Sequence, residues 1–307
     1  MPTSRPCFLG SQRSLPARLL GCSLMAVLLL PATSSAFDLG TLAGIARQAQ
    51  HARPPAAGDE PGGTRAGGPP ARFDASDVYS REQLSSTFDG CKQLFPQARP
   101  LPLNMVDRAW KTRGLCSDQF AVLYSGLAKS PLVVVEKLNR QHLAQAKGNA
   151  RTDNFFPDPR LPRSERAELA DFKGSGFDRG HMASAADQAG ARAMNQSFAL
   201  SNMVMQNSFN NQKTWNKLEQ DTRKYAMRAG GDVYVYTGPI FDAGYSTMGR
   251  GKVWVPTRLF KLVYDEASGR AWAHIVDNAE VDLSRPVDYP AFVQATGLRL
   301  LDGLPVR

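Results

Sequence analysis

Residues that bind transition metals are scarce in this chain, which has four cysteines and four histidines among 307 residues. No Cys-x-x-Cys pair occurs, and the histidines are scattered at positions 51, 142, 181 and 274. A closed zinc site takes four such ligands, usually in closely spaced pairs. The sequence therefore argues against the structural zinc-binding classes.

The chain also lacks an apolar run long enough to span a membrane. Its most apolar run, LLGCSLMAVLLL at residues 19–30, is shorter than the about 20 residues that a spanning helix needs. Arginines precede the run and small residues, PATSSA, follow it, which is the pattern of a secretory signal peptide. We expect residues 1–36 to be a signal peptide cleaved after Ala36. The protein is then exported, periplasmic or secreted, without a membrane anchor.

Removing that segment leaves two cysteines, Cys91 and Cys116. An exported protein meets an oxidising compartment, where an even number of cysteines most simply forms disulfides. The alternative is a pair of buried free thiols, since free cysteine is among the most buried residue types. We expect a Cys91–Cys116 disulfide.

Acidic residues are outnumbered: 28 Asp and Glu face 37 Lys and Arg, for a net charge of +9. A basic exported protein can bind nucleic acid or an anionic envelope surface. Charge alone therefore names no partner.

Composition divides the chain after the signal peptide into two parts. Residues 37–72 are rich in Gly, Pro and Ala and offer little to fill a core, which predicts a disordered linker. From residue 73 to residue 307 the composition is that of one globular domain.

The hydrophobic pattern of this domain predicts strands with a few helices. Helices are expected at 212–228 and at 286–296, the second opened by Ser284 and closed by Gly297. The expected strands cover 120–126, 131–139, 198–204 and 232–241, with a hairpin over 258–278. Without a repeating βαβ order, this mixture indicates the α+β class.

The stretch DRGHMA, residues 178–183, contains residue types that often take part in catalysis. His181 can act as a base near neutral pH, and Arg179 offers a planar fork suited to phosphate. Taken alone, a packed structural histidine is the commoner case.

A second stretch, QNSFNNQKTWNKLEQDTR at 206–223, adds polar residues to a predicted helix. Asn210 and Asn211 stand at its start, where asparagine is also a good cap. Glu219 and Arg223 are four residues apart and share one helix face. Such a pair is often only a surface ion pair.

Together with ALSNM (199–203), these stretches closely resemble the DNA/RNA non-specific endonucleases, which are ββα-metal nucleases, and most of all their endonuclease G branch. The resemblance extends through VYTGPIF (235–241) and VPTRLFKLVYD (255–265). It implies an α+β, ββα-metal (His-Me finger) fold, with a central, mainly antiparallel sheet flanked by helices. Several ordered blocks carry far more weight than one short motif.

The resemblance implies a role for each matched residue. His181 corresponds to the general base, with Arg179 near the phosphate. Asn211, four residues before Trp215, corresponds to the ligand of a single Mg²⁺, for which Mn²⁺ can substitute, and Asn210 is left as a cap or surface residue. Glu219 corresponds to the carboxylate that orients water on the metal.

Further matched residues lie around this set. Arg151 and Arg223 correspond to arginines that serve the substrate phosphate, Arg223 standing behind Glu219. Asp178 and Asn202 correspond to supporting residues. One departure is Ser184, where the family often has proline.

The activity implied is hydrolysis of phosphodiester bonds in both DNA and RNA, because every expected contact is to phosphate rather than to base or sugar. Homodimer formation is compatible with the resemblance. Two alternatives stay open. One is a catalytically silent, exported nucleic-acid-binding protein of the same fold. The other is a metal-dependent phosphatase or sugar phosphodiesterase.

Overall fold

The computed structural model describes residues 74–307. The predicted signal peptide and linker lie outside the described residues. Within residues 74–307, no helix is long and apolar enough to cross a membrane.

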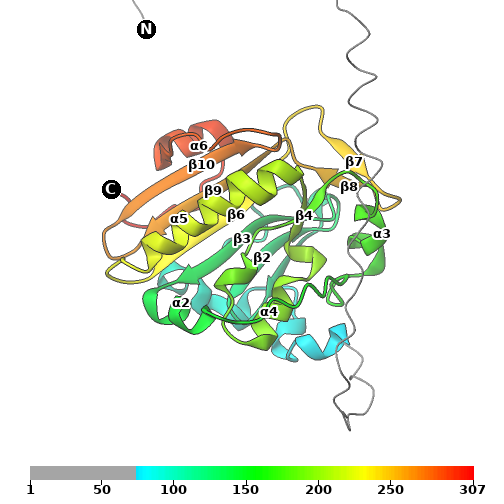
Figure 1. Ribbon diagram of the computed structural model, residues 1–307, viewed down its shortest axis with the longest axis horizontal. Helices are drawn as coiled ribbons and strands as arrows, with labels where there is room; N and C mark the ends of the chain where they lie inside the picture. Colours follow the sequence, from blue (N-terminus) through cyan, green and yellow to red (C-terminus); the bar gives the residue numbers. More distant parts are fainter. Residues whose placement is uncertain (1–73) are drawn as a thin grey trace, which may run out of the picture. The chain divides into compact units, whose positions relative to one another are not determined.

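The domain is built on a seven-stranded sheet in the order β1-β2-β3-β6-β9-β10-β11, in which every pair of neighbours is antiparallel (Figure 1). Its strands are β1 (Thr112–Cys116), β2 (Phe120–Ser125), β3 (Ser130–Leu138), β6 (Val233–Ile240), β9 (Arg258–Asp265), β10 (Arg270–Asp277) and β11 (Val287–Asp288). The central strands are buried along most of their length, so both faces of the sheet must be covered.

Two small hairpins and five α-helices surround this sheet in the described part of the chain. The hairpins pair β4 (Asp178–His181) with β5 (Met203–Gln206), and β7 (Ser246–Met248) with β8 (Val253–Val255). The α-helices are α2 (Arg140–Ala146), α3 (Leu169–Phe172), α4 (Ala191–Ser197), α5 (Asn216–Ala226) and α6 (Tyr289–Thr296). This architecture is α+β, as the sequence predicts.

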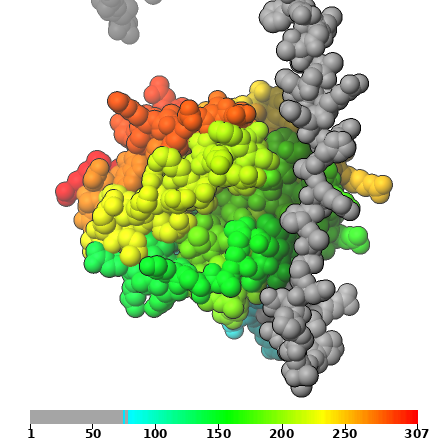
Figure 2. Space-filling model, viewed as in Figure 1, coloured from blue at the N-terminus to red at the C-terminus, as the bar shows by residue number. Residues whose placement is uncertain are grey.

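Alternate residues of the central strands face two separate cores. Along β2, Val122 and Tyr124 pack with Trp215 and Leu218, whereas Leu123 packs on the other side with Phe292 of α6. This follows from the period of two in a strand, which sends successive side chains to opposite faces. Figure 1 shows α5 crossing one face of the sheet, and Figure 2 shows its yellow-green surface exposed between the orange C-terminal strands and the green segments.

The predicted strands at 120–126, 131–139 and 232–241 and the hairpin over 258–278 are confirmed. The predicted strand 198–204 is wrong for most of its length, because Leu200–Asn202 form a 3-10 turn and the strand starts only at Met203. A short, fully buried apolar run has no periodicity that separates a strand from a buried turn.

The two predicted helices exist with different starts. The second begins at Tyr289, capped by Asp288 rather than by Ser284, and ends at Gly297 as expected. The first begins with a π-helical turn, Asn210–Trp215, before α5.

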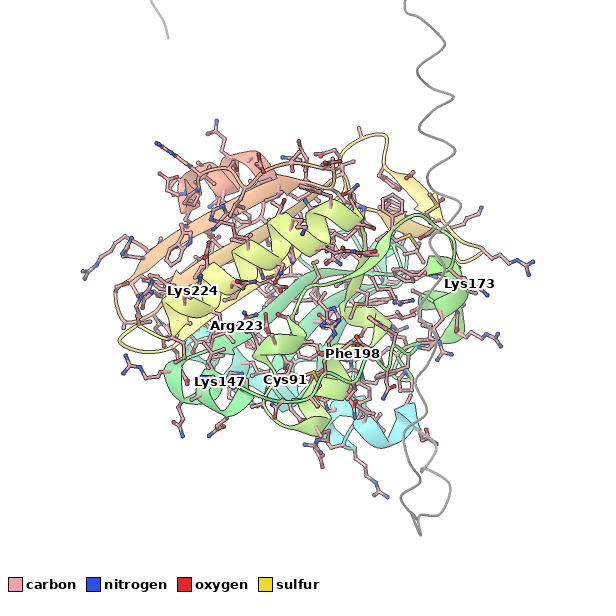
Figure 3. The ribbon with its side chains drawn as sticks, in the orientation of Figure 1. Cys91, Lys147, Lys173, Phe198, Arg223 and Lys224 are labelled. Atoms are coloured by element: carbon pink, nitrogen blue, oxygen red, sulfur yellow. A yellow bond between two sulfur atoms is a disulfide. The ribbon has the colours of Figure 1, made fainter. Side chains whose placement is uncertain are left out.

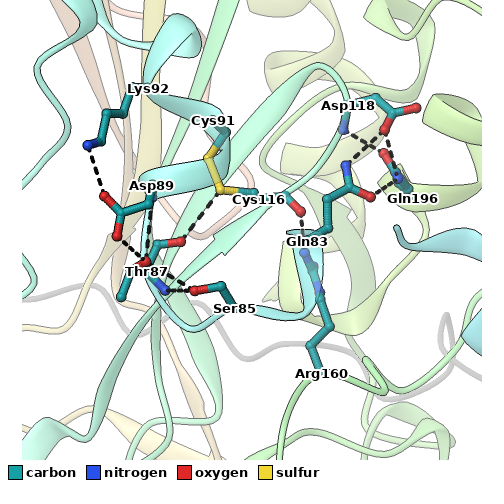
Figure 4. Close-up of a disulfide and its surroundings, with 10 residues drawn as sticks. All are labelled: Gln83, Ser85, Thr87, Asp89, Cys91, Lys92, Cys116, Asp118, Arg160 and Gln196. Atoms are coloured by element: carbon teal, nitrogen blue, oxygen red, sulfur yellow. Dashed lines mark hydrogen bonds and ion pairs between the residues drawn. A yellow bond between two sulfur atoms is a disulfide. The ribbon is translucent and has the colours of Figure 1, made fainter. Parts of the chain in front are cut away.

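The expected disulfide is present: Cys91 is bonded to Cys116, with 5.6 Å between their Cα atoms. It ties the 3-10 segment Asp89–Leu94 to the end of β1 (Figure 4). The backbone oxygen of Cys116 also accepts a hydrogen bond from Arg160 at 2.6 Å. The disulfide therefore lies where three segments distant in sequence meet.

Removing this disulfide should lower the free energy of unfolding by about 3 kcal/mol, because it closes a loop with a sequence separation of 25 residues and so restricts the unfolded chain. Urea unfolding of a Cys91→Ser, Cys116→Ser double variant measures the loss. The reduced wild-type protein is the control and should match the double variant. Equal stability of the oxidised protein and the double variant would contradict the prediction.

Candidate active site

The DRGH strand and the asparagine helix are brought together by a ββα unit. β4 pairs antiparallel with β5, with His181 opposite Met203 and Asp178 opposite Gln206. The chain then passes from β5 into the π-helical turn and α5. This connection places the histidine strand alongside the start of the helix, as Figure 1 shows for β4 and α5.

Gly180 is required because the side chain of Gln206 lies over it, where any Cβ atom would overlap that side chain. The Gln206 amide donates a hydrogen bond to Oδ1 of Asn210 at 2.7 Å. Nδ2 of Asn210 in turn donates to the backbone oxygen of Asp277 at 2.8 Å. The helix start is thus fixed between β5 and β10.

Asn210 is therefore not the cap or surface residue that the sequence suggested, since its side chain is fully buried. The cap is Asn207, whose Oδ1 accepts a hydrogen bond from the backbone N–H of Asn210 at 3.0 Å. π-helical turns are rare and often found at functional sites. Here the turn separates the adjacent asparagines, burying Asn210 and leaving Asn211 partly exposed.

Asn211 is oriented by Asp178. Its Nδ2 donates to the Asp178 carboxylate at 2.9 Å, which also accepts hydrogen bonds from Ser208 and Gln212 at 2.8 and 3.0 Å. Burial raises the pKa of Asp178, but these hydrogen bonds outweigh it and leave the pKa below its usual value. Because Nδ2 is engaged, Oδ1 is the Asn211 atom left for a ligand.

His181 lies at the end of β4 with its ring against two aromatic rings. The centroid distances are 5.0 Å to Phe198 and 5.8 Å to Phe155, and the backbone oxygen of His181 accepts a hydrogen bond from the Trp215 indole at 3.3 Å. Its Nε2 is buried and has no hydrogen-bond partner among the described residues. This atom is free to act on a bound molecule.

Burial, reinforced by the charges of Arg151 and Arg179, lowers the pKa of His181 to about 3. The neutral imidazole, which is the base form, therefore predominates at neutral pH. The packed surroundings that suggest a structural histidine are the same ones that keep it neutral.

The same two phenylalanines also hold the arginines. The Arg179 guanidinium lies 4.1 Å from the ring centroid of Phe155, and that of Arg151 lies 5.0 Å from the ring centroid of Phe198. Arg151 is also paired with Asp153 at 2.6 Å. Cation–π contacts of this kind orient a guanidinium without consuming its N–H groups.

These side chains line one pocket of about 340 Å³. It brings together five of the residues expected from the sequence and three further polar residues. The lining is Arg151, Arg179, His181, Ser184, Asn211, Gln212, Asn216 and Glu219.

Arg223, which the sequence assigned to the substrate phosphate, is not part of that lining. Its guanidinium pairs with Asp187 and donates to Ser184 Oγ at 3.3 Å. Ser184 Oγ in turn donates to Glu219 at 3.1 Å. The serine at this departure from the family pattern thus links Arg223 to Glu219, and Arg223 serves to position the wall of the pocket.

Several charged side chains surround Glu219. Burial raises the pKa of Glu219, although Lys261 acts in the opposite direction. Burial, together with Asp187, also raises the pKa of Glu136 well above its usual value. Glu136 accepts a hydrogen bond from Gln188 at 3.1 Å. Glu219 therefore belongs to one cluster of interacting charges with Glu136, Asp187, Arg223 and Lys261.

Asn202 holds the chain that follows the histidine. Its amide accepts from the backbone N–H of Ala183 and donates to the backbone oxygens of Ala183 and Ser197, all at 2.9 Å. Asn202 is fully buried. Its supporting role is therefore structural.

The segment that carries Arg151 is anchored by a fully buried ion pair, with 2.6 Å between Arg160 and Asp158. Asp158 also accepts a hydrogen bond from Ser201, next to Asn202. The pair thus links the arginine segment to the turn that supports His181.

The other histidines that could compete as bases do not reach the pocket. His142 contacts the backbone oxygen of Asp187 at 2.6 Å, and His274 contacts that of Ser284 at 3.1 Å.

Sequence reasoning missed the roles of Phe155, Phe198, Gln206 and the buried Asn210. Asn210 was noted only as a cap or surface residue, and Ser184 only as a departure from a motif. No local pattern signals the others, because each acts through contacts with residues distant in the chain.

Among residues 74–307, no group of three or more His, Cys, Asp or Glu side chains has the arrangement of a metal site. The pocket instead offers the Oδ1 of Asn211 as a direct ligand and the carboxylate of Glu219 as an acceptor for water on the ion. Magnesium prefers hard oxygen ligands, keeps several waters and often takes only one or two protein ligands. The donors present fit such an ion when substrate phosphate completes its shell.

Comparison with known proteins agrees with this geometry. The family described as DNA/RNA non-specific endonuclease matches residues 106–307. Human mitochondrial endonuclease G is 35% identical over 185 residues, 56% of this chain and 62% of that protein. The mitochondrial Nuclease 1 of Schizosaccharomyces pombe is 32% identical over 202 residues, 58% of this chain and 62% of that protein. The match thus spans less than two thirds of these relatives.

A solved structure is also similar. A chain in the crystal structure of the EndoG/EndoGI complex superposes with a TM-score of 0.55 at 25% identity, covering 63% of this chain and 85% of that one.

Replacing Asn210 by alanine tests whether its hydrogen bonds to Gln206 and Asp277 stabilise the start of the helix. Asn210→Ala leaves the buried Gln206 amide and the Asp277 carbonyl without their partner, so the free energy of unfolding should fall by about 1–3 kcal/mol. Asn207→Ala, which removes only a cap, is the comparison and should cost about 1 kcal/mol. Urea unfolding measures both. Wild-type stability of Asn210→Ala would show that the residue is only a surface group.

Proposed function

Because the chain belongs to the DNA/RNA non-specific endonuclease family, we propose that it hydrolyses phosphodiester bonds in both DNA and RNA. The observation that carries the proposal is the convergence of Arg151, Arg179, His181, Asn211 and Glu219 in one pocket. These residues come from three separate stretches of the sequence.

The two arginines bind the substrate. Arginine recognises phosphate oxygens through paired N–H donors. The contacts with Phe155 and Phe198 do not occupy these donors, and Asp153 engages only the Nε of Arg151. Phosphate contacts carry no information on base or sugar. Acceptance of both DNA and RNA follows.

His181 takes a proton from the attacking water. Its neutral state and the unpaired Nε2 are what a general base requires before the reaction. The ring is held by Phe155 and Phe198, so little reorganisation is needed. Glu219, held by Ser184, orients water on the other side of the pocket.

Asn211 would hold a divalent cation, Mg²⁺ with Mn²⁺ as a substitute, through Oδ1, and Asp178 fixes the direction of that atom. When bound there, the ion would supply positive charge to offset the negative charge that develops on the leaving oxygen.

Export is proposed from residues 1–36, whereas the human and fission-yeast relatives are named as mitochondrial. We propose a periplasmic or secreted enzyme. Homodimer formation is proposed from the family resemblance alone.

A direct test is cleavage of plasmid DNA and of RNA by the purified protein, with and without EDTA. His181→Ala should reduce the rate by at least about 100-fold, and Asn211→Ala should remove the dependence on added Mg²⁺ together with most activity. Gln145→Ala, an exposed amide on α2, is the matched control and should cleave normally.

The same assay separates the alternatives. A silent nucleic-acid-binding protein would bind plasmid without cutting it. A phosphatase would hydrolyse a small chromogenic phosphate monoester and leave plasmid intact. Either result contradicts the proposed function.

The pH dependence follows from the low pKa of His181. With a pKa of about 3, the base form is already complete at pH 5, so kcat/KM should show no acid limb near pH 6.5. Removing one of the charges that lower this pKa should move the acid limb upwards, so Arg151→Gln is the informative variant. A wild-type profile falling tenfold per pH unit below pH 6.5 would contradict the assignment.

A further inference from the structure

A second pocket, of about 450 Å³, lies at the α3 end of the domain and shares no lining residue with the first. Four of its lining side chains are cations: Lys129, Arg163, Arg166 and Arg250. We call these four residues the basic pocket. Figure 3 marks this end of the domain with Lys173, just after α3.

The two carboxylates in its lining, Glu168 and Asp171, are already engaged. Asp171 accepts hydrogen bonds from the backbone N–H groups of Glu168 at 2.9 Å and Gly251 at 2.7 Å. Glu168 pairs with Arg166 at 3.0 Å and more distantly with Arg163 at 3.9 Å. Four cations therefore face two carboxylates, and the pocket keeps an excess of positive charge.

Lys129 and Arg250 provide the unbalanced charge, because neither forms an ion pair within the described part of the chain. Unpaired cations at the rim of a pocket attract anionic ligands.

The position of Arg250 is fixed by its neighbours. Gly249 and Gly251 pack so closely on Asp171 that a Cβ atom at either position would overlap it, and Gly249 has a positive φ of 69°. The turn between β7 and β8 is thus held against α3 by its contacts with Asp171. A cation on an ordered turn loses less conformational entropy on binding than one on a free loop.

One short segment connects the two pockets. Arg151 lines the first and Pro157 lines the second, and the six residue-to-residue steps that separate them in sequence can span at most about 20 Å. Each strand of duplex DNA carries one phosphate per about 3.4 Å of helix axis. A nucleic acid seated in the first pocket therefore has phosphates within reach of the second.

We propose that the basic pocket binds a backbone phosphate of the substrate several nucleotides away from the bond that is cut. The proposal rests on the proposed function, since the ligand is the same nucleic acid. It adds a contact that raises affinity for long substrates and takes no part in the chemistry.

The test is binding of a fluorescein-labelled 20-base-pair duplex, measured by anisotropy over a range of salt concentrations. All variants are made in the His181→Ala background, so that the duplex stays intact. Arg250→Glu and Lys129→Glu should each weaken binding about tenfold or more and make the slope of log K against log[salt] shallower by about one. Arg299→Glu, an exposed arginine that follows α6, is the matched charge-reversal control and should bind like the parent.

A short substrate separates this inference from the proposed function. In the active background, Arg250→Glu should hydrolyse a dinucleotide with unchanged kcat/KM, because that substrate cannot reach the basic pocket, while KM for long duplex rises. If the wild-type protein cleaves duplex but the Arg250→Glu and Lys129→Glu variants bind it as tightly as Arg299→Glu does, the inference is wrong and the proposed function stands. If no nucleic acid is cleaved, the proposed function fails, and the binding measurement still decides the inference. A midpoint temperature of thermal unfolding equal to that of the wild-type protein confirms that each variant is folded.

Discussion

The packing of Gln206 on Gly180 is the contact on which the site depends. It sets the approach of the histidine strand to the strand that leads into the helix, and it is possible only because position 180 has no Cβ atom. The Gln206 amide also bonds Asn210, so one side chain fixes both the strand that carries His181 and the turn that carries Asn211. The distance between the base and the proposed metal ligand is therefore determined by packing within a ββα unit, and not by either side chain itself.

Electrostatics and burial act together on the pKa of His181. Two arginines face the same pocket as His181, and their charges add to burial in keeping the imidazole neutral. The arginines proposed to bind phosphate thus also keep the proposed base in its neutral form. Ser184, which accepts a hydrogen bond from Arg223, donates one to Glu219 and so holds it beside a buried group of charged side chains. Each catalytic candidate is thus held by a neighbouring side chain.

Much of this could be predicted from the sequence, and the failures have identifiable causes. The strands of the central sheet are apolar runs rich in β-forming residues, and the motif spacing selected Asn211, which lines the pocket, rather than Asn210. The same spacing did not reveal that Asn210 is buried, because its partners are the side chain of Gln206 and a carbonyl 67 residues away. The run at 198–204 was mistaken for a strand because a buried turn and a buried strand are equally apolar. Phe155 and Phe198 could not be identified, since an aromatic residue that orients an arginine has no sequence pattern distinct from a core residue. The contacts of Arg223 with Asp187 and Ser184 were not predicted, because helix spacing gives the face of a side chain but not its partner.

The central claim is that a single protein ligand, Oδ1 of Asn211, holds the metal while His181 stands opposite it. The most direct measurement is a crystal structure of the His181→Ala variant with duplex DNA and Mn²⁺, in which anomalous scattering locates the ion. The account predicts one ion bound to Asn211 Oδ1 and to a phosphate oxygen, with the remaining positions filled by water and the vacated imidazole site facing the same phosphate. An ion bound directly by the Glu219 carboxylate, or located outside the pocket, would contradict it.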